Sequence, residues 1–101
     1  MFRHTVQHIL KPGHRKAYVE SLKAFNAAAP GVGLPTYRAW VTMFGDLGTV
    51  FTEADSDSLD GHVKAFEYAH KNEEFMVVFR AMVDHFVPGT IRDYPLEPIE
   101  L

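Results

Sequence analysis

The segment that decides the fold is residues 36–54, which read TYRAWVTMFGDLGTVFTEA. Apolar and polar side chains alternate over Thr36–Phe44, which predicts one strand, and Thr49–Ala54 is predicted to form a second. The connection between them, Gly45–Gly48, contains two glycines that can adopt the positive φ angles of a tight turn. The segment therefore predicts a β-hairpin.

A strand and a helix are predicted before this hairpin. Residues Phe2–Leu10 alternate along a strand, which Pro12 and Gly13 end. From Gly13 to about Ala29 the apolar residues recur every three or four positions, as they do on one face of a helix. These residues are Tyr18, Leu22, Phe25 and Ala29.

Two helices and a fourth strand are predicted after the hairpin. Asp55–Ser58 supplies several side-chain oxygens that can cap a helix starting near Leu59. Asn72 can cap a further helix, so we expect a bend near Lys71. A short strand is predicted over Thr90–Tyr94, after a Pro-Gly pair that ends the second of these helices.

The order of elements, β-α-β-β-α-α-β, predicts a ferredoxin-like α+β fold. Right-handed crossovers give a four-stranded antiparallel sheet of order 4-1-3-2 with the helices on one face. Large apolar side chains occur on both sheet faces, since Ile9 and Trp40 alternate with Val6 and Val41. One helix layer covers only one face, so we expect a homodimer in which two sheets pack together as a dimeric α/β barrel. The arm after Pro95 could then cross to the partner.

Composition limits the class of protein. The chain has 101 residues, a formal net charge of −3 and no cysteine, so we expect one domain over residues 1–101 with no disulfide or thiolate metal site. Its basic residues are scattered, which argues against a nucleic-acid partner. It has no signal-peptide pattern and no apolar run of the roughly 20 residues that cross a bilayer, so we expect no membrane partner and a cytoplasmic location.

Several of these motifs resemble those of NIPSNAP-type domains. They are the segment Leu10–Gly13 with the strand before it and the helix after it, Trp40–Gly48 leading into Val50, and the acidic segment Asp55–Leu59. The resemblance extends over about Phe2–Tyr94 and implies the dimeric α/β barrel superfamily. That superfamily includes cofactor-independent quinone-forming monooxygenases, heme-degrading enzymes and proteins without an assigned activity. The resemblance supplies no catalytic motif that can be transferred to this sequence, so it implies a fold and a dimer rather than a mechanism.

Histidines are the first candidates for chemistry. His4 and His8 are four positions apart on a predicted strand, a span of about 13 Å that one metal ion cannot bridge, so no metal site is predicted. One of the two could line a pocket between sheet and helices as a proton carrier, with His4 the leading candidate, or the histidines could be hydrogen-bonded at a half-buried interface. His70 shares a helical stripe with Leu59 and Phe66, so it either faces a cavity or is a satisfied core group.

Arg38 and Trp40 project to one side of the second strand. Together they could hold a planar anionic ligand, with the guanidinium on a carboxylate or phenolate and the indole stacked on a ring. Alternatively, Trp40 is a core residue and Arg38 lies at the rim of a dimer interface.

The sequence leaves two functions open. In the first, the protein binds a small apolar or aromatic molecule in a pocket between sheet and helices, with His4, Arg38, Trp40 and His70 in its walls. No cofactor is called for, so such an enzyme would be a cofactor-independent monooxygenase or isomerase assisted by His4 or His70. In the second, the chain is a non-catalytic dimerisation or interaction module. A pocket of a few hundred Å³ with convergent polar groups distinguishes the two.

Overall fold

A computed structural model of the chain describes residues 1–44 and 48–101, so most of the predicted turn at Gly45–Gly48 lies outside the described residues. The strands are β1 (Phe2–Ile9), β2 (Arg38–Val41), β3 (Thr49–Ser56) and β4 (Arg92–Leu96). The helices are α1 (Arg15–Ala28), the short 3-10 helix η1 (Ala29–Val32), α2 (Leu59–His70) and α3 (Glu73–Val83). The predicted order of elements is confirmed.

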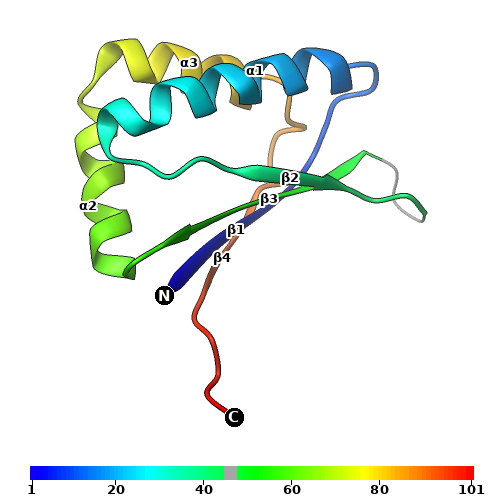
Figure 1. Cartoon of the computed structure of the whole chain (residues 1–101). Helices are drawn as coiled ribbons and strands as arrows, with labels where there is room; N and C mark the ends of the chain where they lie inside the picture. The colour runs from blue at the N-terminus through cyan, green and yellow to red at the C-terminus, as the bar shows by residue number, and fades with distance from the viewer. Residues whose placement is uncertain (45–47) are drawn as a thin grey trace.

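The four strands form one antiparallel sheet of order β2-β3-β1-β4, which is the predicted order read from the other edge. Helices α1 and α3 lie side by side over one face, and α2 lies at one end of the same layer (Figure 1). The ferredoxin-like α+β fold is therefore confirmed. Pro95 lies in β4, an edge strand, where the missing N–H costs least. No helix among the described residues is long and apolar enough to cross a membrane.

β1 ends one residue earlier and β3 ends two residues later than predicted, and the limits of β2 and β4 differ more. β2 pairs with β3 only from Arg38 to Val41, and Met43 and Phe44 beyond it are 76% and 89% exposed. β4 begins two residues later than predicted, because Thr90 still belongs to the preceding turn. Its backbone N–H and its hydroxyl both donate to the carbonyl oxygen of Val87.

The predicted helix signals have the expected effect. The hydroxyl of Ser58 accepts a hydrogen bond from the Gly61 N–H at 3.0 Å, and the Asn72 side chain accepts from the Phe75 N–H at 3.0 Å. These caps satisfy N–H groups that have no partner inside their helices. α2 therefore ends at His70 with Lys71 as its C-cap, and α3 begins at Glu73 after the Asn72 cap. This agrees with the break that the sequence predicts near Lys71.

The core lies between the sheet and the helices. Buried alanines at the contacts, among them Ala29, Ala54 and Ala69, let η1, β3 and α2 approach one another closely. Aromatic side chains fill the larger spaces: Phe25 packs on Phe75 with ring centroids 5.4 Å apart. This contact between α1 and α3 holds the two helices together.

Asn26 fixes the start of β2 against α1. Its side-chain N–H donates to the Tyr37 carbonyl oxygen at 2.8 Å, and its side-chain oxygen accepts from the Tyr37 N–H at 2.8 Å. Tyr37 is 7% exposed, so this pair of bonds also sets the depth at which its ring enters the layer between sheet and helices.

Replacement of Asn26 by alanine is expected to lower the free energy of unfolding by about 2 kcal/mol, because two half-buried hydrogen bonds are lost and each contributes about 1 kcal/mol. Urea unfolding measures the loss. The control is Lys23→Ala, one turn earlier on the exposed side of α1, which is expected to change stability by less than about 0.5 kcal/mol. Equal stability of the two variants would contradict this role for Asn26.

Candidate functional site

A cavity of about 290 Å³ lies between the sheet and helices α1 and α3. β1 contributes His4, Val6 and His8 to its wall, and these side chains face the helices because alternate residues of a strand point to the same side. Most of the remaining wall is apolar. It includes Leu22, Phe25, Phe66, Phe79, Met82, Val83, Phe86 and Ile91. The predicted pocket between sheet and helices is therefore present in the structure.

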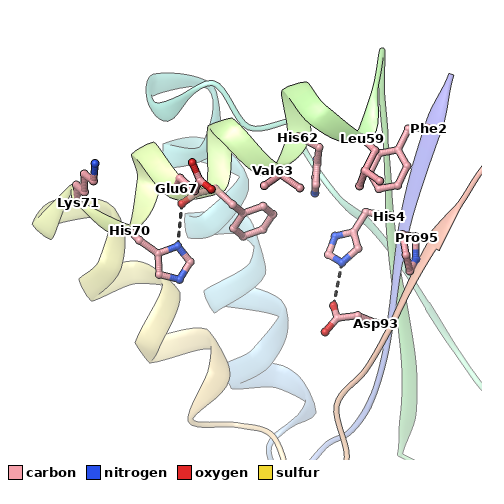
Figure 2. A pocket seen from close by; sticks show the side chains of 11 residues that line it. Phe2, His4, Leu59, His62, Val63, Glu67, His70, Lys71, Asp93 and Pro95 are labelled. Atoms are coloured by element: carbon pink, nitrogen blue, oxygen red, sulfur yellow. Dashed lines mark hydrogen bonds and ion pairs between the residues drawn. The ribbon is translucent and has the colours of Figure 1, made fainter.

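A second, more open pocket of about 660 Å³ lies between α2 and the β1–β4 edge of the sheet (Figure 2). We call it the α2 groove. His4, Phe66 and Asp93 line both the α2 groove and the inner cavity. His4 therefore stands where the two spaces meet.

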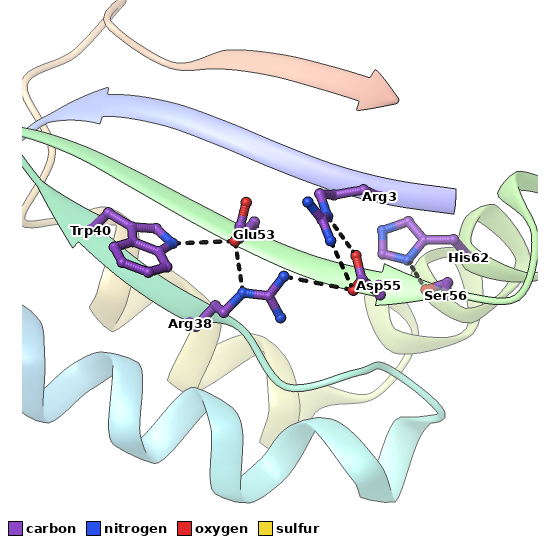
Figure 3. Close-up of polar contacts among 7 residues, drawn as sticks. All are labelled: Arg3, Arg38, Trp40, Glu53, Asp55, Ser56 and His62. Carbon is purple, nitrogen blue, oxygen red and sulfur yellow. Dashed lines mark hydrogen bonds and ion pairs between the residues drawn. The ribbon is translucent and has the colours of Figure 1, made fainter. Parts of the chain in front are cut away.

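A continuous chain of hydrogen bonds passes through His4. Its Nε2 lies 2.9 Å from Oδ1 of Asp93 (Figure 2). Its Nδ1 lies 2.6 Å from the hydroxyl of Tyr37. The same hydroxyl lies 3.3 Å from Nε2 of His62. Nδ1 of His62 in turn lies 3.1 Å from Oγ of Ser56 (Figure 3). Five side chains from β4, β1, the start of β2, α2 and β3 are thus linked.

One arrangement of protons satisfies every link in this chain. The ionised Asp93 carboxylate can only accept, so Nε2–H of His4 donates to it and Nδ1 of His4 accepts from the Tyr37 hydroxyl. The Tyr37 oxygen accepts from Nε2–H of His62, and Nδ1 of His62 accepts from Ser56. A proton taken up at one end can therefore be relayed by reversing successive bonds. Ser56 and His62 also line a separate polar pocket, through which the far end of the chain meets solvent.

Burial keeps the middle of this chain uncharged. It raises the pKa of Tyr37 well above its ordinary value, and the charge of Asp93 adds to the rise. Burial also lowers the pKa of His62, and the neighbouring His4 adds to that decrease. At neutral pH, Tyr37 and His62 therefore act as neutral donors and acceptors rather than as ions.

His8 lies farther along β1 and is only 1% exposed. Its ring stacks on Phe86, with centroids 3.8 Å apart and an interplanar angle of 27°. Burial lowers the pKa of His8 to about 4, so the ring is neutral at pH 7. From the sequence, either His4 or His8 could line a pocket as a proton carrier, and a metal ion shared by the two was not predicted. Among the described residues there is no cluster of three or more histidine or carboxylate side chains that could hold a metal ion.

His70, the other histidine expected at a cavity, lies at the end of α2 and lines the α2 groove (Figure 2). It is exposed, and its Nδ1–H donates to the carbonyl oxygen of Phe66 at 2.8 Å. The buried histidine of α2 is His62, at 6% exposure, whereas Leu59 is 51% exposed. The predicted stripe of Leu59, Phe66 and His70 therefore lines the open α2 groove. The neighbouring face of α2, which carries His62 and Ala69, is the buried one.

Arg38 and Trp40 do not lie where the sequence placed them. We expected them in one pocket wall with His4 and His70, but they project from the opposite face of the sheet. Tyr37 at the start of β2 is buried towards the helices, so the alternating neighbours face away from them. They line none of the pockets described above.

On that open face the two side chains belong to an ion-pair network (Figure 3). Nε of Arg38 and Nε1 of Trp40 both donate to Oε1 of Glu53, at 2.6 and 3.2 Å. Arg3 donates twice to Asp55, at 2.7 and 3.2 Å. These bonds hold the pKa values of Glu53 and Asp55 below their ordinary range, Arg38 acting on the first and Arg3 on the second. An anionic ligand would have to displace these carboxylates from Arg38.

Four residues of the site were missed as site residues from the sequence, among them Ser56, which was read only as a possible helix cap. Tyr37 reads as an ordinary strand aromatic, and His62 as one of several histidines on a helix. Asp93 lies on the same face as His4 only because it pairs with Val6 in the β1–β4 register. The alternation of apolar residues could have indicated that Tyr37 faces inward, but no local signal gives the β1–β4 register.

The stability of the fold is expected to decrease as the pH falls from about 6.5 to about 4, because the His8 pKa is near 4 in the folded chain and 6.5 is its ordinary value. In this range the unfolded chain binds more protons, so acid favours unfolding, by about 3 kcal/mol across the range. Urea unfolding at several pH values tests this. His8→Phe should flatten the dependence, whereas Met82→Leu in the same wall should retain it; parallel curves for all three proteins would contradict the assignment.

No family model matches the sequence, and no curated protein matches it. The structure is similar to that of an uncharacterised NIPSNAP domain protein from Burkholderia xenovorans, with a TM-score of 0.80 and 12% identity over 98% of this chain and 95% of the other. A NIPSNAP family protein from Agrobacterium tumefaciens gives a TM-score of 0.79 and 15% identity over 98% and 86%.

An antibiotic biosynthesis monooxygenase is also similar, with a TM-score of 0.71 and 13% identity over 99% of this chain and 100% of the other. At such identities the similarity is one of fold. The chain therefore shares the ferredoxin-like fold of NIPSNAP family proteins and of antibiotic biosynthesis monooxygenases, as the motifs in its sequence predict.

Proposed function

We propose that this protein binds a small apolar or aromatic molecule in the inner cavity and that His4 moves a proton on that molecule. The observation that carries the proposal is the cavity of about 290 Å³, whose largely apolar wall holds the His4–Asp93 pair where it meets the α2 groove. Small-molecule sites commonly combine an apolar wall with a few placed polar groups.

The geometry around His4 suits it to accept a proton. Asp93 fixes the proton of the neutral ring on Nε2 and stabilises the imidazolium that forms when Nδ1 takes up a second proton. Tyr37 occupies Nδ1 at 2.6 Å and also lines the cavity. A proton released by the ligand at the Tyr37 oxygen would thus reach His4 as Tyr37 passes on its own proton.

This step is common to isomerisation and to cofactor-independent oxygenation. In isomerisation, the proton returns to a different atom of the ligand. In oxygenation, the deprotonated ligand reacts with molecular oxygen, and the antibiotic biosynthesis monooxygenase with the same fold makes this chemistry a reasonable alternative. The relay through Tyr37 and His62 would serve either reaction, since it needs only a site that exchanges protons with the ligand.

An enolisable aromatic ketone, 2-tetralone, tests the proton step. The protein is expected to accelerate exchange of its acidic C–H protons in D2O, measured by ¹H NMR, and His4→Gln should slow this exchange by at least about 100-fold. His14→Gln is the matched control, because His14 lies outside both pockets and should keep the full rate. Exchange at the buffer rate with ketone bound would contradict the proton-transfer role, and no binding of aromatic probes would favour the non-catalytic module.

We further propose that two copies pair through their open sheet faces. The helices leave this face uncovered, and it exposes apolar side chains, among them Ile9, Trp40, Tyr94 and Leu96. Trp40 is 59% exposed beside the paired charges of Glu53 and Arg38. A second copy would cover the apolar groups, while the charges, which are already paired within each copy, could enter the interface without being left alone.

Sedimentation at micromolar concentration tests the dimer. The native chain is expected to sediment as a dimer, and Trp40→Glu as a monomer, because a new carboxylate beside Glu53 would be buried without a partner. Val77→Glu provides the control, since Val77 is equally exposed at 59% but lies on α3 in the helix layer. A monomeric native chain, or a Trp40→Glu variant that stays dimeric, would contradict this interface.

A further inference from the structure

We propose that His8 and Tyr18 bind an uncharged oxygen of the ligand, a hydroxyl or a carbonyl group, at the end of the inner cavity away from His4. The inference rests on the proposed function and deepens it, because it specifies the chemical class of the ligand. It also assigns His8 and Tyr18 a role in recognition that their packing alone does not require.

Three polar atoms in the cavity wall lack partners. Both ring nitrogens of His8 and the hydroxyl of Tyr18 are buried and have no hydrogen-bond partner among the described residues. Both side chains line the inner cavity. Buried polar groups are nearly always hydrogen-bonded, because an unpaired group loses its hydration without compensation. Phenylalanine at both positions would stabilise the fold more, because it has no polar atom to leave unpaired. The presence of histidine and tyrosine therefore indicates a polar partner that enters the cavity.

The two side chains are held in place by packing. His8 stacks on Phe86 at 3.8 Å, and the Tyr18 ring approaches His8 edge-on, with centroids 5.3 Å apart and an interplanar angle of 64°. Tyr18 is 2% exposed and also contacts Phe86, at 5.7 Å between centroids. Their polar atoms are therefore presented by fixed rings from β1 and α1, which limits the entropy lost when a ligand binds.

The environment selects a neutral group. Burial lowers the pKa of His8 and raises that of Tyr18 well above its ordinary value, so both are uncharged at pH 7. No lysine or arginine is among the described residues that line this cavity. A carboxylate would therefore be buried without a positive partner, at a large cost. A neutral imidazole and a phenol each offer a donor and an acceptor, which matches a hydroxyl or a carbonyl oxygen.

The position of His8 also indicates the size of the ligand. His8 and His4 are four residues apart on β1, a separation of about 13 Å along a strand. A flat molecule of two or three fused rings could reach from Tyr18 and His8 towards His4. The cavity would then recognise its ligand at one end and act on it at the other.

Three probes of matched shape test this inference by calorimetry or fluorescence at pH 7: naphthalene, 2-naphthol and 2-naphthoate. The native protein is expected to bind 2-naphthol about tenfold more tightly than naphthalene, as two neutral hydrogen bonds would give, and 2-naphthoate more weakly than either. His8→Phe and Tyr18→Phe should each reduce the preference for 2-naphthol. Tyr68→Phe, at an exposed tyrosine of α2 that lines neither pocket, should leave it unchanged.

The outcomes separate this inference from the proposed function. Equal binding of naphthalene and 2-naphthol would overturn the inference and leave small-molecule binding intact, whereas no binding of any probe would overturn both. A preference for 2-naphthol that both phenylalanine variants retain, or tightest binding of 2-naphthoate, would also overturn the inference.

The free variants provide a second measurement. His8→Phe and Tyr18→Phe are expected to melt at higher temperature than the native protein without ligand, because each removes an unpaired buried group. Should a variant fail to fold, the ring ¹⁵N signals of His8 in the native protein decide. They are expected to shift when 2-naphthol is added and to stay in place with naphthalene, and an identical response to both probes would overturn the inference.

Discussion

The strict alternation of side chains along β1 is the constraint on which the rest of the structure depends. It directs Phe2, Val6 and the histidines between and beyond them to the helix side of the sheet, while Arg3 faces the other way. β1 thus places two imidazole rings in a largely apolar layer between sheet and helices. One is tied to Asp93 and Tyr37, and the other is packed on Phe86 without a polar partner among the described residues.

The two faces of the sheet carry different groups of side chains. The helix face holds the cavity, the histidines and the hydrogen-bonded chain to Ser56. The open face holds the pairs of Arg3 and Arg38 with Asp55 and Glu53, beside exposed apolar groups. The proposed proton transfer and the proposed dimer would therefore use opposite faces of the sheet, so that a substitution on one face need not disturb the other.

Local patterns in the sequence predicted the fold better than the site. The hairpin, the caps at Ser58 and Asn72 and the strand order follow from turn chemistry and short-range periodicity, which the structure bears out. The same reasoning predicted that His4 lies in the wall of a pocket between sheet and helices. Its partners were not predicted, because Tyr37 and Asp93 meet it only through the antiparallel register of strands far apart in sequence. Arg38 and Trp40 were assigned to the wrong face of the sheet. Apolar residues occur on both sides of β2, so the pattern alone does not indicate which side faces the helices.

The most direct test of the account is the protonation pattern of the His4 ring, read from long-range ¹H–¹⁵N NMR correlations of the native chain. The hydrogen bonds of His4 require a neutral ring with its proton on Nε2, where Asp93 accepts it, and an Nδ1 that accepts from Tyr37. A ring with its proton on Nδ1, or the averaged signals of a freely rotating surface histidine, would mean that the hydrogen bonds linking Asp93 to Ser56 through His4 are not formed.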